Sequence, residues 1–329
     1  MPQASYNIRM GAITSQPSRS IGKLTEEEII RRVTANLGQA CPPFPAGPGG
    51  DCAIFEETMS RKFRVSTVDS VILGRHFDSS TAGALAGAKL VNRNLSDLAA
   101  AGAVPSDALL SLLVGPDVDA EWLEDFAHGV GKAAHKFTLN CVGGDICRIS
   151  AGTFAATLAV QGYAHRVLTR KTAKCGDVIF VTGKLGGSIY GHHLNFEPRL
   201  AEGEWLNTQS IVTACTDLSD GMAKDLHGLI NIAQDAVIDL TSLPLADAAH
   251  QLSKADGKPA VEHALQDGED YELLFTVDAQ QADLLEANFK KQFPKTPLKS
   301  IGVVTEGTGL IKSRTDGVVI TSRGFGHFA

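Results

Sequence analysis

The sequence lacks several features that would each indicate a class of protein. Its 329 residues contain no C-x-x-C pair, and the spacing of its six cysteines does not suggest zinc. In a chain of this length we expect the cysteines to be reduced thiols, which favours a cytoplasmic location. No apolar run approaches the roughly 18 residues that a membrane-spanning helix needs. The sequence therefore predicts neither a disulfide framework nor a transmembrane segment.

Positive charge and the common phosphate-binding motifs are also scarce. The formal net charge is -7, whereas nucleic acids and anionic membranes usually bind clusters of Lys and Arg. The chain contains no G-x-x-x-x-G-K-[ST] loop and neither of the protein-kinase signatures H-R-D and D-F-G. We therefore expect no nucleic-acid or membrane partner, although a small anion held through a metal ion remains consistent with this charge.

Composition and length predict a globular protein of two domains. Hydrophobic residues make up 43% of the chain and charged residues 20%, and domains average about 150 residues. Predicted strands alternate with helices, which favours an α/β or α+β fold. The pattern restarts near Val167, so we place a boundary near residue 165. We expect a flexible tail over residues 1–23, a first domain over 24–165 and a second domain over 166–329.

Three helices of the first domain can be located from local signals. Residues 24–37 contain Thr25, a candidate N-cap, and place glutamates in the first turn, where the helix dipole favours them. Residues 82–103 form a second candidate helix, which ends before Pro105. Residues 120–137 repeat apolar side chains at helical spacing and form the third.

Aspartates recur in one local context, beside Gly, Ser or Asn at the predicted end of a strand. They are Asp51, Asp69, Asp97, Asp145, Asp217 and Asp220. Loops beyond strand ends bind ligands in open α/β folds, and glycine lets the backbone approach a phosphate or a metal. Each aspartate by itself could instead cap a helix or form a turn, and Asp97 and Asp220 each precede a predicted helix.

Six carboxylates in one pocket would repel one another unless cations compensated them. Mg²⁺ prefers oxygen ligands and usually uses one or two carboxylates per ion together with substrate phosphates. The aspartates therefore suggest several Mg²⁺ ions that clamp a polyphosphate, as phosphoryl transfer requires. The glycine-rich stretch 182–191 is a weaker signal, because a plain strand-to-helix turn uses the same residues.

Six longer segments occur in a fixed order along the chain. They are STVDSVILGRHF, NLSDLAAAGAVP, CVGGD, VLTRKTAKCGDVIFVTG, TDLSDGMAKDL and DGEDYELLFTV. Together they resemble the thiamine-monophosphate kinases, in the superfamily of aminoimidazole ribonucleotide synthetase. The resemblance runs from about Gly47 to the C-terminal GFGHF, and G-x-H-F and GEDYELLFT are its most specific parts.

The resemblance implies a fold and an activity. The fold would have two domains, with the N-terminal domains forming a β-barrel across a homodimer and the active site in a cleft between domains. The enzyme would transfer the γ-phosphoryl group of ATP directly to thiamine monophosphate, giving thiamine diphosphate and ADP. A divergent synthetase or kinase acting on another small phosphorylated metabolite, and a non-catalytic nucleotide binder, are the alternatives.

The resemblance also implies a role for individual residues. The six aspartates would be Mg²⁺ ligands, and Asp217 and Asp220 would hold the metal at the ATP phosphates. The nucleotide contacts would be Gly144, Asp145, Arg170 and Ser219. The contacts to the thiamine moiety would be His76, Glu269 and Phe325. Lys89 matches a lysine of the family, but a surface lysine is as plausible, and Glu269 could pair with the cationic thiazolium or cap a turn.

The sequence departs from the family pattern at a few positions. Gly50 and Gly187 stand where the family has aspartate, and Val68 stands where it has threonine. The helix expected near Gly191 is nearly deleted. The six main aspartates survive these changes, so the departures bear on the choice of substrate more than on the use of ATP and Mg²⁺.

Overall fold

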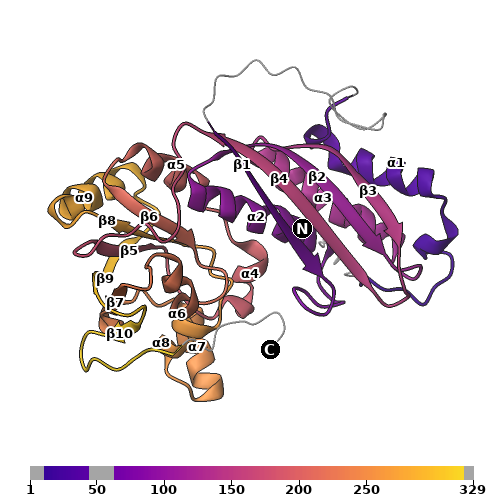
Figure 1. Cartoon of the computed structure of the whole chain (residues 1–329). Helices are drawn as coiled ribbons and strands as arrows, with labels where there is room; N and C mark the ends of the chain where they lie inside the picture. The colour runs from indigo at the N-terminus through magenta and orange to yellow at the C-terminus, as the bar shows by residue number, and fades with distance from the viewer. Residues whose placement is uncertain (1–10, 44–62, 322–329) are drawn as a thin grey trace, which may run out of the picture. The chain divides into compact units, whose positions relative to one another are not determined.

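The computed structural model describes residues 11–43 and 63–321, and Figure 1 shows their order along the chain. Contacts between residues divide the chain into two compact units. Of the described residues, unit 1 contains 11–43, 66–94 and 105–162, and unit 2 contains 63–65, 95–104 and 163–321. Helix α2 (Gly83–Ala101) contributes to both units, because the division falls after Asn94. The domain boundary near residue 165 stays a prediction.

Unit 1 is built on a four-stranded sheet in the order β1-β4-β2-β3. Its strands are β1 (Phe63–Ile72), β2 (Val104–Val114), β3 (Asn140–Arg148) and β4 (Phe154–Ala164). Every second residue of β4 is buried, beginning with Phe154, so this strand turns one face to a core. Strands β2 and β3 run parallel, and their register pairs Ser111 with Asp145.

The helices predicted in the first part of the chain are present, with shifted ends. They are α1 (Glu26–Leu37), α2 and α3 (Ala120–Lys136). The hydroxyl of Thr25 accepts a hydrogen bond from the N–H of Glu28 at 3.3 Å, which confirms the predicted N-cap of α1. Helices α2 and α3 approach so closely at Gly87 that a Cβ there would lie 2.1 Å from the carbonyl oxygen of Phe126. Glycine permits this approach because it has no side chain.

Unit 2 contains a six-stranded sheet in the order β10-β7-β9-β5-β8-β6. Its strands are β5 (Val178–Thr182), β6 (Val212–Asp217), β7 (Gln234–Ile238), β8 (Leu273–Val277), β9 (Leu298–Glu306) and β10 (Ile311–Ser313). Strand β10 pairs parallel to β7, and the other pairs are antiparallel. Its helices are α4 (His192–Asn195), α5 (Leu200–Thr208), α6 (Met222–Asp225), α7 (Asp247–Asp256), α8 (Ala260–Gln266) and α9 (Ala282–Gln292).

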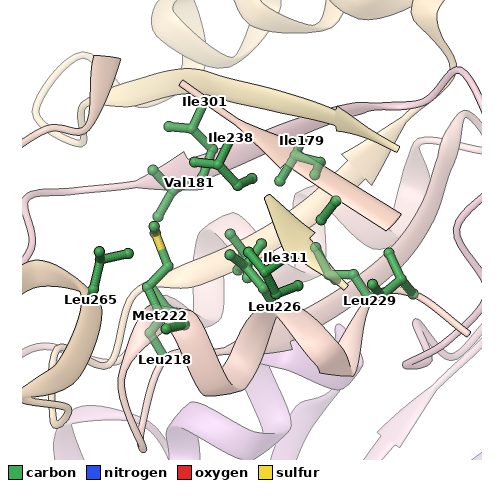
Figure 2. Close-up of a cluster of buried hydrophobic side chains, with 14 of the residues drawn as sticks. Ile179, Val181, Leu218, Met222, Leu226, Leu229, Ile238, Leu265, Ile301 and Ile311 are labelled. Carbon is green, nitrogen blue, oxygen red and sulfur yellow. The ribbon is translucent and has the colours of Figure 1, made fainter. Parts of the chain in front are cut away.

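The sheet of unit 2 has a hydrophobic core on each face. Ile179 of β5 belongs to one core and its neighbour Phe180 to the other, because successive side chains of a strand point to opposite faces. Figure 2 shows the first core, where Leu218 and Met222 pack near the strands. Both side chains are fully buried, so they anchor the chain before and after Asp220.

Two sheets with packed helices confirm the predicted mixed α/β class. Within residues 11–43 and 63–321, no helix combines the length and apolar character that crossing a bilayer would require.

Candidate active site

The stretch TDLSDG contains a loop, residues 217–221, which we call the acidic loop. It begins with Asp217, the last residue of β6, as predicted. The side chain of Asp217 is buried, and its carboxylate accepts a hydrogen bond from the hydroxyl of Ser96 at 2.6 Å. Ser96 belongs to α2 and lies directly before Asp97 in the motif NLSD. Unit 2 therefore brings the NLSD and TDLSDG motifs together through this contact.

Asp225 holds the acidic loop from the far end of α6. One of its carboxylate oxygens, Oδ2, accepts hydrogen bonds from the N–H groups of Ser219 and Asp220, both at 3.0 Å. Burial raises the pKa of Asp225 to about 7, and the charge of Asp220 adds to the rise. The two backbone hydrogen bonds lower the pKa but do not outweigh burial. Asp220 itself is partly exposed and forms an ion pair with Lys224. The sequence analysis assigned no role to Asp225, although it lies in the same aspartate-rich stretch.

A second segment, residues 268–272 (the GEDYE segment), lies along the acidic loop. The N–H of Glu269 donates to the carbonyl oxygen of Ser219 at 2.9 Å, and the N–H of Tyr271 donates to that of Leu218 at 2.7 Å. Glu269 and Tyr271 have φ angles of 56° and 51°, in the left-handed region that residues with a Cβ rarely adopt. The predicted thiamine contact Glu269 is therefore next to the predicted nucleotide contact Ser219.

The glycine-rich stretch joins the same network through Asp270. The N–H of Gly186 donates to Oδ1 of Asp270 at 2.8 Å, and the N–H of Gly187 donates to Asp267 at 3.2 Å. Burial raises the pKa of Asp270 well above its ordinary value, and the charges of nearby carboxylates add to the rise. Its Oδ2 is buried and has no hydrogen-bond partner among the described residues. Burial therefore favours the neutral form of Asp270 more than it would for an exposed aspartate.

Position 187 has no room for the aspartate that the family pattern has there. A Cβ on Gly187 would lie 2.5 Å from the backbone carbon of Ala248 in α7, and its φ angle is 75°. Glycine at this position follows from the close approach of the loop and α7.

Arg170 lies on the surface of unit 2, and the residue before it is hydrogen-bonded to β6. Its neighbour Thr169 accepts a hydrogen bond from the N–H of Cys215 at 3.1 Å, and the N–H of Lys171 donates to Gly228 at 2.7 Å. The Arg170 side chain is exposed, which leaves its guanidinium accessible to a phosphate.

Unit 1 contains the predicted metal ligands Asp69 and Asp145, and both lie within strands. The expectation of a position at a strand end is therefore wrong for these two, whereas Asp217 does close β6. Asp69 forms a two-point ion pair with Arg93, at 3.1 Å for each contact. Asp145 is exposed and accepts a hydrogen bond from the thiol of Cys147 at 3.1 Å. The sequence did not predict the pairing of Arg93 with Asp69, because α2 brings Arg93 to β1 only in the folded chain.

Asp97 and Gly144 also differ from the simplest expectation. Asp97 lies inside α2, so it neither precedes a helix nor follows a strand. A Cβ at Gly144 would lie 1.8 Å from the carbonyl oxygen of Leu110, so close pairing of β3 with β2 already requires this glycine. Its predicted nucleotide contact stays a prediction.

His76 and Lys89 interact within unit 1. The Nδ1 of His76 accepts a hydrogen bond from the N–H of Ile72 at 3.0 Å. The ammonium of Lys89 donates to the carbonyl oxygen of His76 at 2.8 Å. Lys89 is fully buried, so the alternative of a surface lysine is wrong.

The expected Mg²⁺ ligands are divided along the chain. Asp51 lies outside the described residues, Asp69 and Asp145 belong to unit 1, and the remaining aspartates belong to unit 2. The predicted thiamine contact Phe325 also lies outside the described residues. Among residues 11–43 and 63–321, no group of three or more His, Cys, Asp or Glu side chains is placed to hold a metal ion. The donor chemistry of the aspartates nevertheless fits Mg²⁺, which prefers carboxylate oxygens.

Comparison with known proteins extends the sequence resemblance to most of the chain. Residues 49–164 match the family described as AIR synthase related protein, N-terminal domain. Thiamine-monophosphate kinase of Escherichia coli (strain K12) is 33% identical over 331 residues, which covers 92% of this chain and 98% of that protein. Thiamine-monophosphate kinase of Rhodopirellula baltica is 33% identical over 279 residues, covering 82% and 87%.

Solved structures with a similar fold include one with the same name and one of a complex with two small molecules. The crystal structure of thiamine-monophosphate kinase from Stenotrophomonas maltophilia K279a has a TM-score of 0.74 at 29% identity, covering 90% of this chain and 98% of that one. A structure of AaThiL complexed with AMPPCP and TMP has a TM-score of 0.70 at 28% identity, covering 80% and 87%.

Proposed function

Because the chain belongs to the thiamine-monophosphate kinase family, we propose that it phosphorylates thiamine monophosphate with ATP, giving thiamine diphosphate and ADP. The γ-phosphoryl group passes directly from ATP to the acceptor phosphate, in line and without a phosphoenzyme. The observation that carries this proposal is the identity to named kinases along nearly their whole length. A related structure holds AMPPCP and TMP together, which supports the same pair of substrates for this chain.

The contacts of unit 2 support separate roles for its predicted site residues in binding phosphate, nucleotide and thiamine. The acidic loop is anchored by two buried apolar side chains and held by Ser96 and Asp225. Rigid placement of this kind is what phosphoryl transfer needs, because positioning and charge compensation supply most of its catalysis. Asp217 and Asp220 act at the ATP phosphates, Ser219 contacts the nucleotide and Glu269 contacts the thiamine moiety.

The remaining site residues complete the proposal. Arg170 offers a planar fork to a phosphate group, and Gly144 and Asp145 contact the nucleotide. His76 and Phe325 contact the thiamine moiety, and an aromatic ring such as that of Phe325 can stack on one of its rings.

We also propose that the six aspartates hold Mg²⁺ ions. Bound Mg²⁺ would neutralise the phosphate charge and orient the polyphosphate. The burial of Asp217 supports this role, since a carboxylate largely removed from water favours a cationic partner.

The first experiment combines the purified chain, ATP, MgCl₂ and thiamine monophosphate, with thiamine diphosphate measured by chromatography. We expect product that disappears when a chelator is added. ADP that forms only when another phosphorylated metabolite replaces thiamine monophosphate would point to that metabolite as the acceptor. Tight binding of ATP without turnover of any acceptor would indicate a nucleotide-binding protein and overturn the kinase proposal.

The outer face of the unit 1 sheet supports a homodimer. Val68 and Ile72 of β1 and Leu109 of β2 are exposed, at 62%, 43% and 47%. Leu109 lies between two buried residues and Ile72 follows a buried one, and Val68 lies four positions before Ile72, so all three lie on the face away from the core. We expect light scattering to give a dimer mass and Val68→Lys to shift it towards the monomer. A monomeric wild-type protein would contradict a dimer built on this face.

We also propose a cytoplasmic location, which would keep the cysteines reduced. Cys41, Cys141, Cys147, Cys175 and Cys215, the cysteines in the described residues, form no disulfide.

A further inference from the structure

Tyr271 is held firmly in a backbone conformation that its side chain disfavours. Its φ angle is 51°, and its side chain is almost fully buried. Its ring stacks on that of Phe196, with 3.9 Å between the ring centroids and 14° between the planes. A left-handed residue with a Cβ persists only where its surroundings hold it, and such residues cluster at functional sites. The conformation of Tyr271 therefore calls for a function beyond filling space.

The hydroxyl of Tyr271 reaches Glu269, two residues earlier in the GEDYE segment. It donates a hydrogen bond to Oε1 of Glu269, with 3.2 Å between the oxygens. The backbone N–H groups of both residues also donate to the acidic loop, at 2.9 Å for Glu269 and 2.7 Å for Tyr271. The Glu269 carboxylate is thus tied by its backbone to the acidic loop and by its side chain to a buried ring.

We propose that Tyr271 is a positioning residue for the phosphate acceptor, whose hydroxyl holds the Glu269 carboxylate in the orientation that binds the cationic thiazolium ring. This inference rests on the proposed function. A glutamate side chain that is ordered before the substrate arrives loses less conformational freedom on binding, which strengthens affinity. Tyr271 thereby sets the affinity for thiamine monophosphate and leaves the affinity for ATP unchanged.

Tyr271→Phe tests this role with a minimal change, because it keeps the ring and its stacking on Phe196. We expect the KM for thiamine monophosphate to rise about tenfold, as loss of a hydrogen bond to a charged group typically does. The kcat and the KM for ATP should stay within a factor of about two. Loss of binding that the ground state and the transition state share equally raises the KM for that substrate alone.

A double-mutant cycle with Glu269→Gln separates positioning from a general structural effect. If Tyr271 acts through Glu269, adding Tyr271→Phe to Glu269→Gln should raise the KM for thiamine monophosphate little further. An equal rise in both backgrounds would overturn the proposal, and so would an unchanged KM in the single variant. A parallel rise in the KM for ATP would indicate structural damage and also overturn it.

Calorimetric titration of thiamine monophosphate keeps this test distinct from the test of the proposed function. If the wild-type chain turns over no substrate, the kinase proposal fails, but the titration still compares wild type with Tyr271→Phe. Equal affinity of the two proteins would overturn the role of Tyr271. Weaker binding by the variant, with the same melting temperature, would support it.

Discussion

Arg199→Met should destabilise unit 2, because Arg199 compensates a buried carboxylate. Arg199 donates through Nε and Nη2 to the two carboxylate oxygens of Glu272, at 2.7 and 2.6 Å. The Glu272 side chain is only 3% exposed, and the hydroxyl of Thr182 donates to it at 2.7 Å. In the variant the carboxylate keeps that hydroxyl but loses its cation. Breaking one side of a buried ion pair costs about 3–5 kcal/mol, so we expect the free energy of unfolding to fall by that amount.

Urea unfolding followed by circular dichroism measures this loss, provided that the variant and wild type have equal m values. Arg31→Met is the matched control: its side chain is 71% exposed, and its ion pair with Glu28 spans 3.6 Å. An exposed pair of this kind should change stability by less than about 1 kcal/mol. Adding Glu272→Gln to Arg199→Met removes the uncompensated charge and should restore part of the loss. A cost of Arg199→Met no larger than that of Arg31→Met would refute the reasoning.

Three further predictions concern catalysis, acid stability and strand packing. Asp217→Asn should lower kcat by orders of magnitude while circular dichroism stays native, and near-normal turnover would remove Asp217 from the site. Burial acts to raise the pKa of Asp235, but Lys312 and two backbone N–H groups outweigh it and lower the pKa to about 2. This carboxylate therefore stabilises the fold above about pH 4 and loses its contribution as the pH falls towards 2, so urea midpoints of Asp235→Asn and wild type should converge there. Gly144→Ala should lower the free energy of unfolding by about 1–3 kcal/mol, because the added Cβ meets Leu110, and an unchanged urea midpoint would contradict the close strand contact.

Local signals predicted several elements correctly. Thr25 caps α1 because its hydroxyl reaches an N–H three residues along the chain, and such short-range geometry depends on residue order alone. The placement of Asp217 at the end of β6 follows from the apolar strand that precedes it. The ordered motifs also predicted the family, which the comparisons with known kinases confirmed.

The same local signals failed where long-range contacts decide the environment. Lys89 can be assigned to a surface or a core only when the groups around its ammonium are known, and the fold buries it against His76. The motif around Asp97 suggested a strand end before a helix, but α2 continues through this residue, as the helix predicted over residues 82–103 already required.

By itself, the sequence determined the class of fold, the family and the types of side chain available for binding phosphate and metal. Only the tertiary structure decided which of these side chains meet: Ser96 with Asp217, 121 residues apart, and Tyr271 beside Glu269 against the acidic loop. Chain order specifies each residue's chemistry and nearest neighbours. Burial and hydrogen-bond partners arise only when distant segments pack, and they determine how each carboxylate is held and charged.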